Sequence, residues 1–453
     1  MMIEAPIHKL VIKMAVPTIV SMLITSFYNM ADTFFVGRIG TSATAAVGVV
    51  MPLMAIIQAI GFFFGQGSGN YISRLMGARD SAEASRVAST GFFTALACSV
   101  LFMGSLLLAV PKIVSLLGST ATIQPYAESY LRYILLGAPF MASSFVLNNQ
   151  LRLQGNASYA MVGITIGAVL NIGLDPLLIF GFKMGITGAA VATSFSQFVS
   201  FCVLLIGCTR GGSVPIKLKD YSPNSKNLKE IAKAGLPSLC RQSLASIAIV
   251  ALNVSAAVYG DPAVAAMSIV GRLMMFATSV LLGFGQGFQP VCGFNYGARR
   301  YDRVLNAFWF CIKIGAVGLL LLAVTGELFA PQIITAFRKD DLEVIRIGTR
   351  ALRLQCAFFP LMSWVILCNM LTQNIGAFLS ASVLAFARQG LFFLPLILIL
   401  PGILGLSGVQ WAQPAADACT FLLSVPIGYS VIRSLKKQMN EESKSEITQG
   451  EKT

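Results

Sequence analysis

Residues 45–72 read AAVGVVMPLMAIIQAIGFFFGQGSGNYI and contain no charged side chain. An α-helix rises about 1.5 Å per residue, so this run is long enough to cross the roughly 30 Å hydrocarbon core of a bilayer. Eleven further apolar runs lie along the chain between polar breaks. The pattern predicts an all-α polytopic membrane protein, because helices satisfy their own backbone hydrogen bonds in lipid. The predicted spans are 12–35, 45–72, 88–110, 127–150, 159–182, 188–208, 233–257, 264–292, 306–330, 346–372, 380–401 and 408–433.

The composition excludes several classes of protein. Of the 453 residues, 56% are hydrophobic and only 11% are charged, whereas charged residues make up about 25% of soluble domains. A soluble enzyme, a disordered protein and a secreted disulfide scaffold are therefore excluded. One histidine and nine scattered cysteines offer no ligand cluster of the kind that a membrane metalloenzyme uses. We expect no enzyme activity, no cofactor and no structural metal.

The basic residues predict the orientation of the chain. The net charge is +14, and most lysines and arginines lie in the loops on one side of the predicted spans, as the positive-inside rule requires. Both termini are therefore expected in the cytoplasm. The basic residues form no dense patch with interleaved aromatic side chains, so nucleic acid is not an expected partner.

The chain is a tandem repeat with an offset of 220 residues. The recurring pairs include Pro17 with Pro237, Phe64-Gly65-Gln66-Gly67 with Phe284-Gly285-Gln286-Gly287, and Gly77-Ala78-Arg79 with Gly297-Ala298-Arg299. Six helices per half bring both halves into the membrane from the same side, which predicts two lobes related by a pseudo-two-fold axis along the membrane normal. The predicted domains are an amino-terminal six-helix lobe at 1–209, a cytoplasmic linker at 210–232, a carboxy-terminal six-helix lobe at 233–435 and a disordered cytoplasmic tail at 436–453.

Two acidic residues in the amino-terminal lobe break the repeat. Asp32 lies in the first span, and its repeat partner is Leu252. Asp175 lies in the fifth span, and no acid occurs around its partner position, Leu394-Pro395. A carboxylate within a membrane helix costs about 2.5–3.5 kcal/mol on insertion scales, so it is retained when it has a role.

These two acids predict a cation site in the amino-terminal lobe. Asn171 and Asp175 share a helix face because they are four residues apart. Asp32 and Thr193 fall at a similar depth, in the outer half of the membrane. Carboxylate, amide and hydroxyl oxygens suit a proton or a hard cation such as Na⁺. Two carboxylates close together in a low dielectric also favour proton uptake near neutral pH.

An alternative is structural: Asp32 and Asp175 could cap helix ends or pair with Arg38 and Lys183 at the outer interface. Pro17 lies about four turns before Asp32 and removes a backbone hydrogen bond from its helix. It is either a static kink or a hinge that bends when Asp32 changes charge.

Asp417 in the twelfth span is a third membrane acid, and its repeat partner is Gln197. Arg388 and Gln389 in the eleventh span could neutralise it. A buried structural pair is the favoured interpretation, and a second contact to a cation or substrate is the alternative. Arg241 in the seventh span has no obvious partner in the sequence.

At these positions the chain resembles the multidrug and toxic compound extrusion (MATE) family over nearly its whole length. The matching motifs are Asn29-x-x-Asp32-Thr33-x-Phe35-Val36-Gly37-x-x-Gly40, Arg152-x-x-Gly155-Asn156-Ala157, Asn171-x-x-x-Asp175-Pro176 and Gln289-Pro290-x-x-Gly293-x-Asn295-Tyr296-Gly297-Ala298. The Pro-x-Ala-Asp segment that ends at Asp417 looks most like the staphylococcal multidrug exporter branch of the subfamily named for a DNA-damage-inducible protein.

This resemblance implies a twelve-helix antiporter of a prokaryotic inner membrane that exports lipophilic or cationic compounds in exchange for H⁺ or Na⁺. The implied cation site is Asp32, Asn171, Asp175 and Thr193, and the implied bending proline is Pro17. Tyr28 and Asn148 match cavity positions near that site, and Asp417 is a further candidate cavity residue. Small lipophilic or cationic molecules and membrane lipid are the expected partners, and a monomer is the expected state.

Two other functions are weighed against drug export. A lipid-linked precursor flippase of the same superfamily is the main alternative, and it is kept open by Arg241, Arg272 and Arg388. Those proteins usually have additional helices and a cationic cavity, so the acidic pair argues against it. A membrane enzyme is disfavoured because the sequence offers no nucleophile–base motif.

Overall fold

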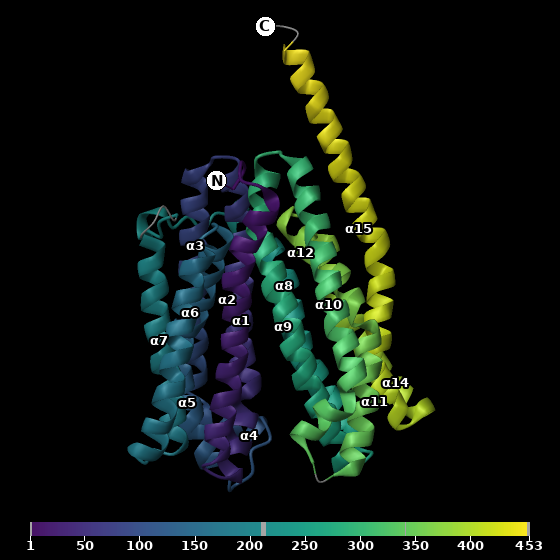
Figure 1. Cartoon of the computed structure of the whole chain (residues 1–453). Coiled ribbons are helices and arrows are strands. Elements are labelled where there is room, and N and C mark those ends of the chain that lie inside the picture. Colours follow the sequence, from purple (N-terminus) through teal and green to yellow (C-terminus); the bar gives the residue numbers. More distant parts are fainter. Residues whose placement is uncertain (1, 210–213, 340, 451–453) are drawn as a thin grey trace. The chain divides into compact units, whose positions relative to one another are not determined.

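The structure is a computed structural model that describes residues 2–209, 214–339 and 341–450. Within these ranges it is helical and contains no strand (Figure 1). Twelve helical stretches of the described chain are long and apolar enough to cross a membrane, which confirms the predicted number. Nine of them are α1 (Ile7–Gly37), α2 (Thr41–Gly77), α3 (Ser81–Leu107), α5 (Gln124–Leu153), α7 (Ile186–Thr209), α8 (Ser225–Ala257), α9 (Asp261–Gly297), α10 (Tyr301–Phe337) and α15 (Leu406–Gly450).

The other three spans are interrupted helices. The fifth is α6 (Ala157–Pro176) followed by the π-helical turn η1 (Leu177–Gly181). The tenth joins α11 (Leu342–Phe358), η3 (Phe359–Leu361) and α12 (Met362–Asn374), and the eleventh joins α13 (Phe378–Phe386), the π-helical η4 (Ala387–Phe393) and α14 (Leu394–Leu404). The short α4 (Val110–Leu116) and η2 (Leu218–Asp220) lie outside the spans.

The helix ends follow local sequence signals. The Asp80 side chain accepts a hydrogen bond from the backbone N–H of Glu83 and so caps α3. Arg79 and Arg299, which are repeat partners, both have positive φ (63° and 58°) in the turns after α2 and α9. A left-handed conformation at a non-glycine residue is uncommon, so its occurrence at both positions shows that the repeat extends to backbone detail.

The helices form two compact units. Val16–Leu239 is called here the N-terminal unit, and Met1–Ala15 together with Cys240–Thr453 is called the C-terminal unit. Each boundary within a helix lies beside a repeat proline, Pro17 in α1 or Pro237 in α8. The expected lobes began at residues 1 and 233, so the structure assigns the first turns of α1 and α8 differently from the sequence-based division.

Glycines account for this assignment. In the N-terminal unit a Cβ at Gly67 of α2 would overlap the carbonyl oxygen of Ile231 in the first turns of α8. In the C-terminal unit a Cβ at Gly287 of α9 would overlap the backbone of Ala15 in α1. Gly67 and Gly287 are repeat partners. Both allow a backbone approach that any side chain would prevent.

Replacement of Gly67 by valine is expected to destabilise the N-terminal unit by about 3 kcal/mol, because the side chain would force α2 away from Ile231. Gly48→Val is the matched control. Gly48 lies on the same helix, and a Cβ there would meet no atom within 4 Å. Thermal unfolding of both purified variants in detergent measures the difference. Equal unfolding temperatures for the two variants would show that this contact does not hold α8 in place.

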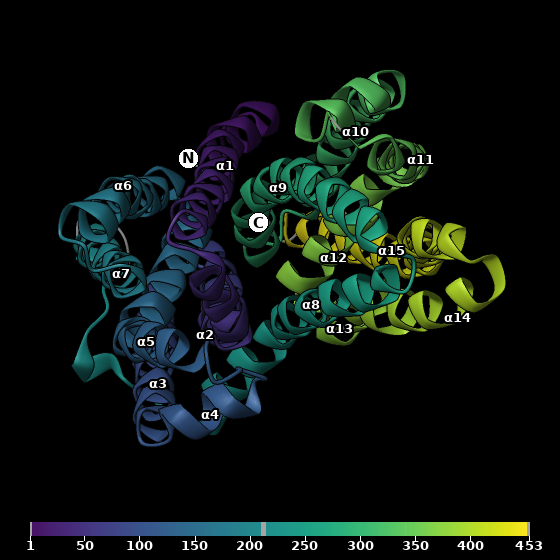
Figure 2. The same ribbon diagram turned by 90° about the horizontal axis from the view of Figure 1, so that it is seen from below.

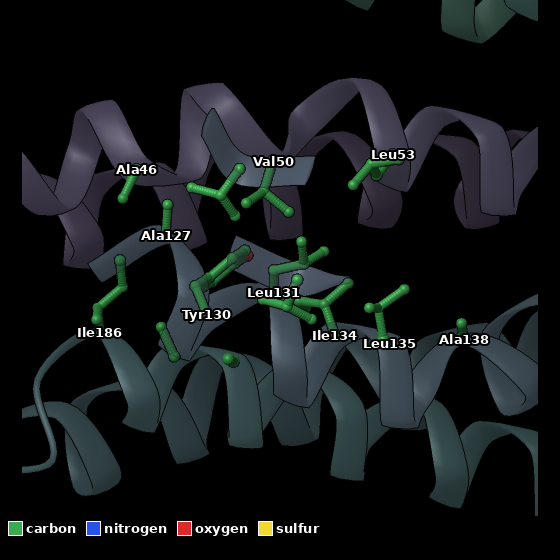
Figure 3. Close-up of a cluster of buried hydrophobic side chains, with 14 of the residues drawn as sticks. Ala46, Val50, Leu53, Ala127, Tyr130, Leu131, Ile134, Leu135, Ala138 and Ile186 are labelled. Carbon is green, nitrogen blue, oxygen red and sulfur yellow. The ribbon is translucent and has the colours of Figure 1, made fainter. Parts of the chain in front are cut away.

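The core of the N-terminal unit forms around α5. Figure 2 shows α5 beside α2 and α3, and α5 also contacts α6 and α7. The close-up in Figure 3 shows Val50 and Leu53 of α2 facing Leu131 and Ile134 of α5, and these four side chains are buried. The buried polar residues bridge helices. Gln66 of α2, for example, donates to the Asn149 side chain of α5 at 3.0 Å.

The predicted linker is only partly a separate segment. Its first residues, 210–213, lie outside the described chain, whereas Val214 donates its backbone N–H to the Gln154 side chain at 2.8 Å. Ser222 exchanges hydrogen bonds with Thr90 of α3, and α8 begins at Ser225. The described linker is thus packed on the N-terminal unit.

The region expected to be a disordered tail differs from that expectation. Helix α15 continues to Gly450 (Figure 1), and only 451–453 of the expected tail lie outside the described residues. The stretch contains good helix formers and the i,i+4 ion pair of Lys437 with Glu441 at 3.8 Å. Local helix propensity therefore extends a span that apolar burial alone would end near residue 435.

Candidate functional site

Three of the predicted cation ligands meet between α6 and α7 in the N-terminal unit. Asn171, Asp175 and Thr193 are 1%, 0% and 3% exposed. The Asn171 side-chain N–H₂ lies 3.4 Å from Asp175 Oδ1 and 3.4 Å from Thr193 Oγ1. These distances are at the long end for hydrogen bonds. The three side chains therefore contact one another without consuming their full hydrogen-bonding capacity.

Asp32 completes the predicted set from α1. Its side chain is half-buried, and it is close enough to Asp175 for their charges to interact. Tyr28, one turn earlier on α1, is near both carboxylates, and its hydroxyl is within hydrogen-bonding reach of Thr193 and Gln197. The structure thus brings Asn171, Asp175 and Thr193 into contact and places Asp32 and the predicted cavity residue Tyr28 within electrostatic range of Asp175.

Three oxygen atoms of this cluster have no hydrogen-bond donor among the described residues. Asp32 Oδ1, Asn171 Oδ1 and Asp175 Oδ2 are buried, and none of them accepts a hydrogen bond from the described part of the chain. Buried polar atoms in proteins are nearly always hydrogen-bonded, so each exception calls for an explanation. Three acceptors from two carboxylates and one amide form the donor set that a proton or a hard cation would satisfy.

The backbone around Asp175 is distorted from a regular α-helix. Asp175 is followed by Pro176, which has no N–H and cannot continue the hydrogen-bond ladder of α6. The chain then widens into the π-helical turn η1, a feature that is frequent at functional sites. Helix α7 packs against this turn at Gly188, where a Cβ would lie 2.8 Å from the carbonyl carbon of Leu178. This close approach allows Thr193, further along α7, to reach Asn171.

The alternative pairing of the acids at the outer interface is not seen. Neither Asp32 nor Asp175 forms an ion pair within 4.0 Å among the described residues. The guanidinium of Arg38 instead lies over the ring of Phe34, 4.7 Å from its centroid. No basic side chain of the described chain therefore neutralises either carboxylate.

Pro17 and Asn148, the other two predicted residues of this unit, have equivalents in the second half of the repeat. Pro17 lies inside α1 at the boundary between the two units, and its carbonyl accepts a hydrogen bond from the Ser21 hydroxyl at 2.9 Å. The half-buried Asn148 donates to the carbonyl of Ala160 at 3.0 Å and so ties α5 to the start of α6. Asn369, which matches Asn148 at an offset of 221 residues, donates to Ala381 in the same way at 2.7 Å.

Asp417 is part of an ion pair in the C-terminal unit. Its Oδ1 accepts hydrogen bonds from Arg388 Nε and from Gln413 Nε2, both at 2.8 Å. The favoured pairing of Arg388 with Asp417 is therefore present, and Arg388 comes from the π-helical η4. Gln389, which was also predicted to neutralise Asp417, forms no hydrogen bond with it in the described chain. Gln413, one turn before Asp417 on α15, takes that place.

Sequence reasoning missed two residues near the cation cluster. Tyr130 of α5 is 1% exposed and lies within electrostatic range of Asp32 and Asp175. Its sequence neighbours, Ser129 and Leu131, give no sign that its side chain lies near the acids. Gln197, which is near Tyr28, could have been found because it is the repeat partner of Asp417. The same repeat position thus carries a polar side chain in both units.

Comparison with known proteins identifies the family. The MatE family model matches residues 17–177 and 237–399, two segments that begin at the repeat prolines Pro17 and Pro237. The chain belongs to the MatE family. This confirms the resemblance found in the sequence and makes the protein a membrane transporter rather than an enzyme.

Curated and structural relatives of this MatE protein cover nearly its full length. The multidrug export protein MepA of Staphylococcus saprophyticus is 28% identical over 94% of both chains, and MepA of Staphylococcus aureus strain NCTC 8325 is 27% identical with the same coverage. A solved structure described as the outward-facing conformation of a multidrug resistance MATE family transporter of the MOP superfamily is 29% identical. It covers 96% of this chain and 98% of its own chain, with a TM-score of 0.91.

Proposed function

We propose that this MatE protein is a secondary active multidrug exporter of the cell membrane that exchanges lipophilic or cationic compounds for H⁺ or Na⁺. The proposal rests mainly on three buried oxygen atoms, one each on Asp32, Asn171 and Asp175, that accept no hydrogen bond from the described chain. An intramembrane acid is costly, and two acids without a basic partner are retained where a cation binds. The MepA relatives, which are named as multidrug exporters, support the class of substrate.

The proposed mechanism couples cation binding to drug release. In the outward-open state a cation binds at Asp32, Asn171, Asp175 and Thr193. It neutralises the carboxylates and weakens the attraction for a cationic drug. Helix α1 then bends at Pro17, which already lacks one backbone hydrogen bond. The two lobes rock to the inward-open state, and the cation leaves to the cytoplasm, where both termini lie.

Ethidium efflux from proteoliposomes tests this function. A pH gradient and a Na⁺ gradient are imposed separately, so that the gradient that drives efflux identifies the coupling ion. Efflux under either gradient supports a coupled exporter. If folded protein exports no drug under either gradient, the proposal fails for this class of substrate. Complementation of a flippase-depleted strain then tests the lipid-linked precursor alternative.

Thr193→Val is expected to raise the coupling-cation concentration needed for half-maximal efflux by about tenfold, because it removes one polar oxygen contact from the site. The substitution keeps the side-chain shape. The matched control is Thr209→Val on the same helix, where the hydroxyl bonds only to the carbonyl of Ile206. An unchanged cation dependence in Thr193→Val would remove Thr193 from the site.

A further inference from the structure

The C-terminal unit contains an arginine that faces no acid. Arg241 lies on α8, 16 residues after Ser225 and about 24 Å along the helix at 1.5 Å per residue. Among the described residues its guanidinium forms no ion pair within 4.0 Å, and its one hydrogen bond runs to Asn369 Oδ1 at 3.4 Å. A guanidinium has five N–H donors. Most of its donors are therefore available to a ligand.

The Arg241 side chain is directed into the unit rather than toward a membrane surface. Its contact, Asn369 on α12, is 6% exposed. The Asn369 amide donates to the carbonyl of Ala381 at 2.7 Å, which holds its oxygen on the Arg241 side. Arg241 is itself half-buried, and none of its nitrogens is sealed inside the protein without a partner. The head of Arg241 is thus fixed by a buried amide and remains accessible.

Comparison of the two halves of the repeat indicates that the fold does not require an arginine at position 241. Asn148 of the N-terminal unit makes the same bond to Ala160 that Asn369 makes to Ala381. The repeat partner of Arg241, however, is Ser21. The asparagine bridge therefore belongs to the shared architecture, and the cation is an addition in one half. The acids Asp32 and Asp175 are the corresponding additions in the other half.

Arg388, the other half-buried arginine considered in this unit, has the contacts expected of a structural arginine. Arg388 is neutralised by Asp417 at 2.8 Å, with support from Gln413. Arg241 has no such partner in the described chain. An unpaired guanidinium in a membrane protein is costly and marks a site for a substrate or ion. Carboxylates and phosphates are its natural ligands, because two oxygens match the planar fork of donors.

We propose that Arg241, positioned by Asn369, binds the carboxylate of amphipathic substrates, so that zwitterionic compounds are preferred to the corresponding cations. The proposal rests on the exporter function proposed above and adds a substrate class to it. The acids of the N-terminal unit bind the coupling cation, and Arg241 of the C-terminal unit binds the anionic end of the substrate.

A pair of dyes that differ only at the carboxylate tests the proposal. Rhodamine B carries a free carboxylate, and its ethyl ester is the corresponding cation. Binding of both dyes to purified full-length protein is measured by fluorescence anisotropy for the wild type, Arg241→Gln, Arg241→Lys and the control Arg353→Gln. Arg353 is exposed and bonds only to the carbonyl of Glu327. Ester efflux from proteoliposomes reports the proposed function separately.

The wild type is expected to bind rhodamine B about tenfold more tightly than the ester, the size of one charge-assisted contact. Arg241→Gln is expected to lose this preference for rhodamine B, while its affinity for the ester stays within about twofold of the wild type. Arg241→Lys is expected to keep part of the preference, and Arg353→Gln all of it. If the wild type exports the ester but shows no preference for the acid, or if Arg241→Gln weakens both dyes equally, the inference is wrong and the exporter function stands. Absence of ester export by the folded wild type contradicts the exporter function itself.

A second arm distinguishes a substrate carboxylate from a lipid phosphate. Phosphatidylglycerol is added to the micelles in place of phosphatidylcholine. Unchanged binding of rhodamine B supports the substrate assignment. Displacement of rhodamine B from the wild type by phosphatidylglycerol assigns the anion site to lipid and overturns the proposed substrate preference.

Discussion

Asp32→Asn abolishes gradient-driven ethidium efflux, to the level of protein-free liposomes, if the carboxylate is the group that carries the coupling cation. The asparagine side chain has nearly the same shape, but it is always neutral and cannot alternate between cation-bound and cation-free states. The protein should remain folded, because Asp32 forms no ion pair in the described chain that the substitution would break. Efflux is measured under both a pH gradient and a Na⁺ gradient, with thermal unfolding as the check on folding.

The repeat offers a matched control for this variant. Leu252 occupies the position of Asp32 in the C-terminal unit, and Leu252→Asn introduces the same amide there. It should leave efflux largely intact, because no carboxylate is lost. Full activity of Asp32→Asn, or equal loss in both variants, would contradict a coupling role for Asp32.

Asp417→Ala is expected to destabilise the C-terminal unit by about 3 kcal/mol. The substitution leaves Arg388 without its counter-charge inside the C-terminal unit, where the Asp417 side chain is only 10% exposed. The value lies at the lower end of the range for broken buried pairs, because the Arg388 side chain is 26% exposed and keeps some contact with its surroundings. Thermal unfolding in detergent measures the loss.

Replacement of both partners separates a structural pair from a substrate contact. Asp417→Leu combined with Arg388→Met removes both charges, and apolar replacements of buried ion pairs are often neutral in stability. The double variant should therefore unfold close to the wild type. If it is stable but has lost ethidium efflux, Asp417 contacts the substrate or its cation. If Asp417→Ala alone is as stable as the wild type, the ion pair has no structural role.

The general architecture could be predicted from the sequence because it depends on patterns that extend over many residues. The length of the apolar runs determines the number of spans, and the offset of 220 residues relates Pro17 to Pro237 without gaps. Asp32 and Asp175 stood out because membrane acids are costly and because their repeat partners are apolar. Asn171 followed from helical spacing, since residues four apart share a face.

Other features depend on packing that no local pattern encodes. The offset shows that the first turns of α1 and α8 are equivalent, but it does not show which unit they contact. That choice depends on Gly67 and Gly287, where neighbouring backbones approach closely. Tyr130 of α5 lies within electrostatic range of the acids, and Gln413 rather than Gln389 hydrogen-bonds to Asp417. The side-chain directions of these residues are set by helix rotation and by the π-helical turns, which the sequence alone does not reveal.

The most direct test of the central claim measures ethidium affinity against pH and Na⁺ concentration, for the wild type and for Asp32→Asn combined with Asp175→Asn. The account requires that cation binding at these carboxylates and drug binding oppose each other, and linkage makes that opposition reciprocal. For proton coupling, the carboxylates are neutral at low pH, so wild-type affinity should rise with pH and should approach that of the double variant at low pH. For Na⁺ coupling it should fall as Na⁺ is added. The double variant should bind ethidium weakly and equally under all conditions. If the double variant shows the same dependence as the wild type, the carboxylates do not couple the cation to the drug.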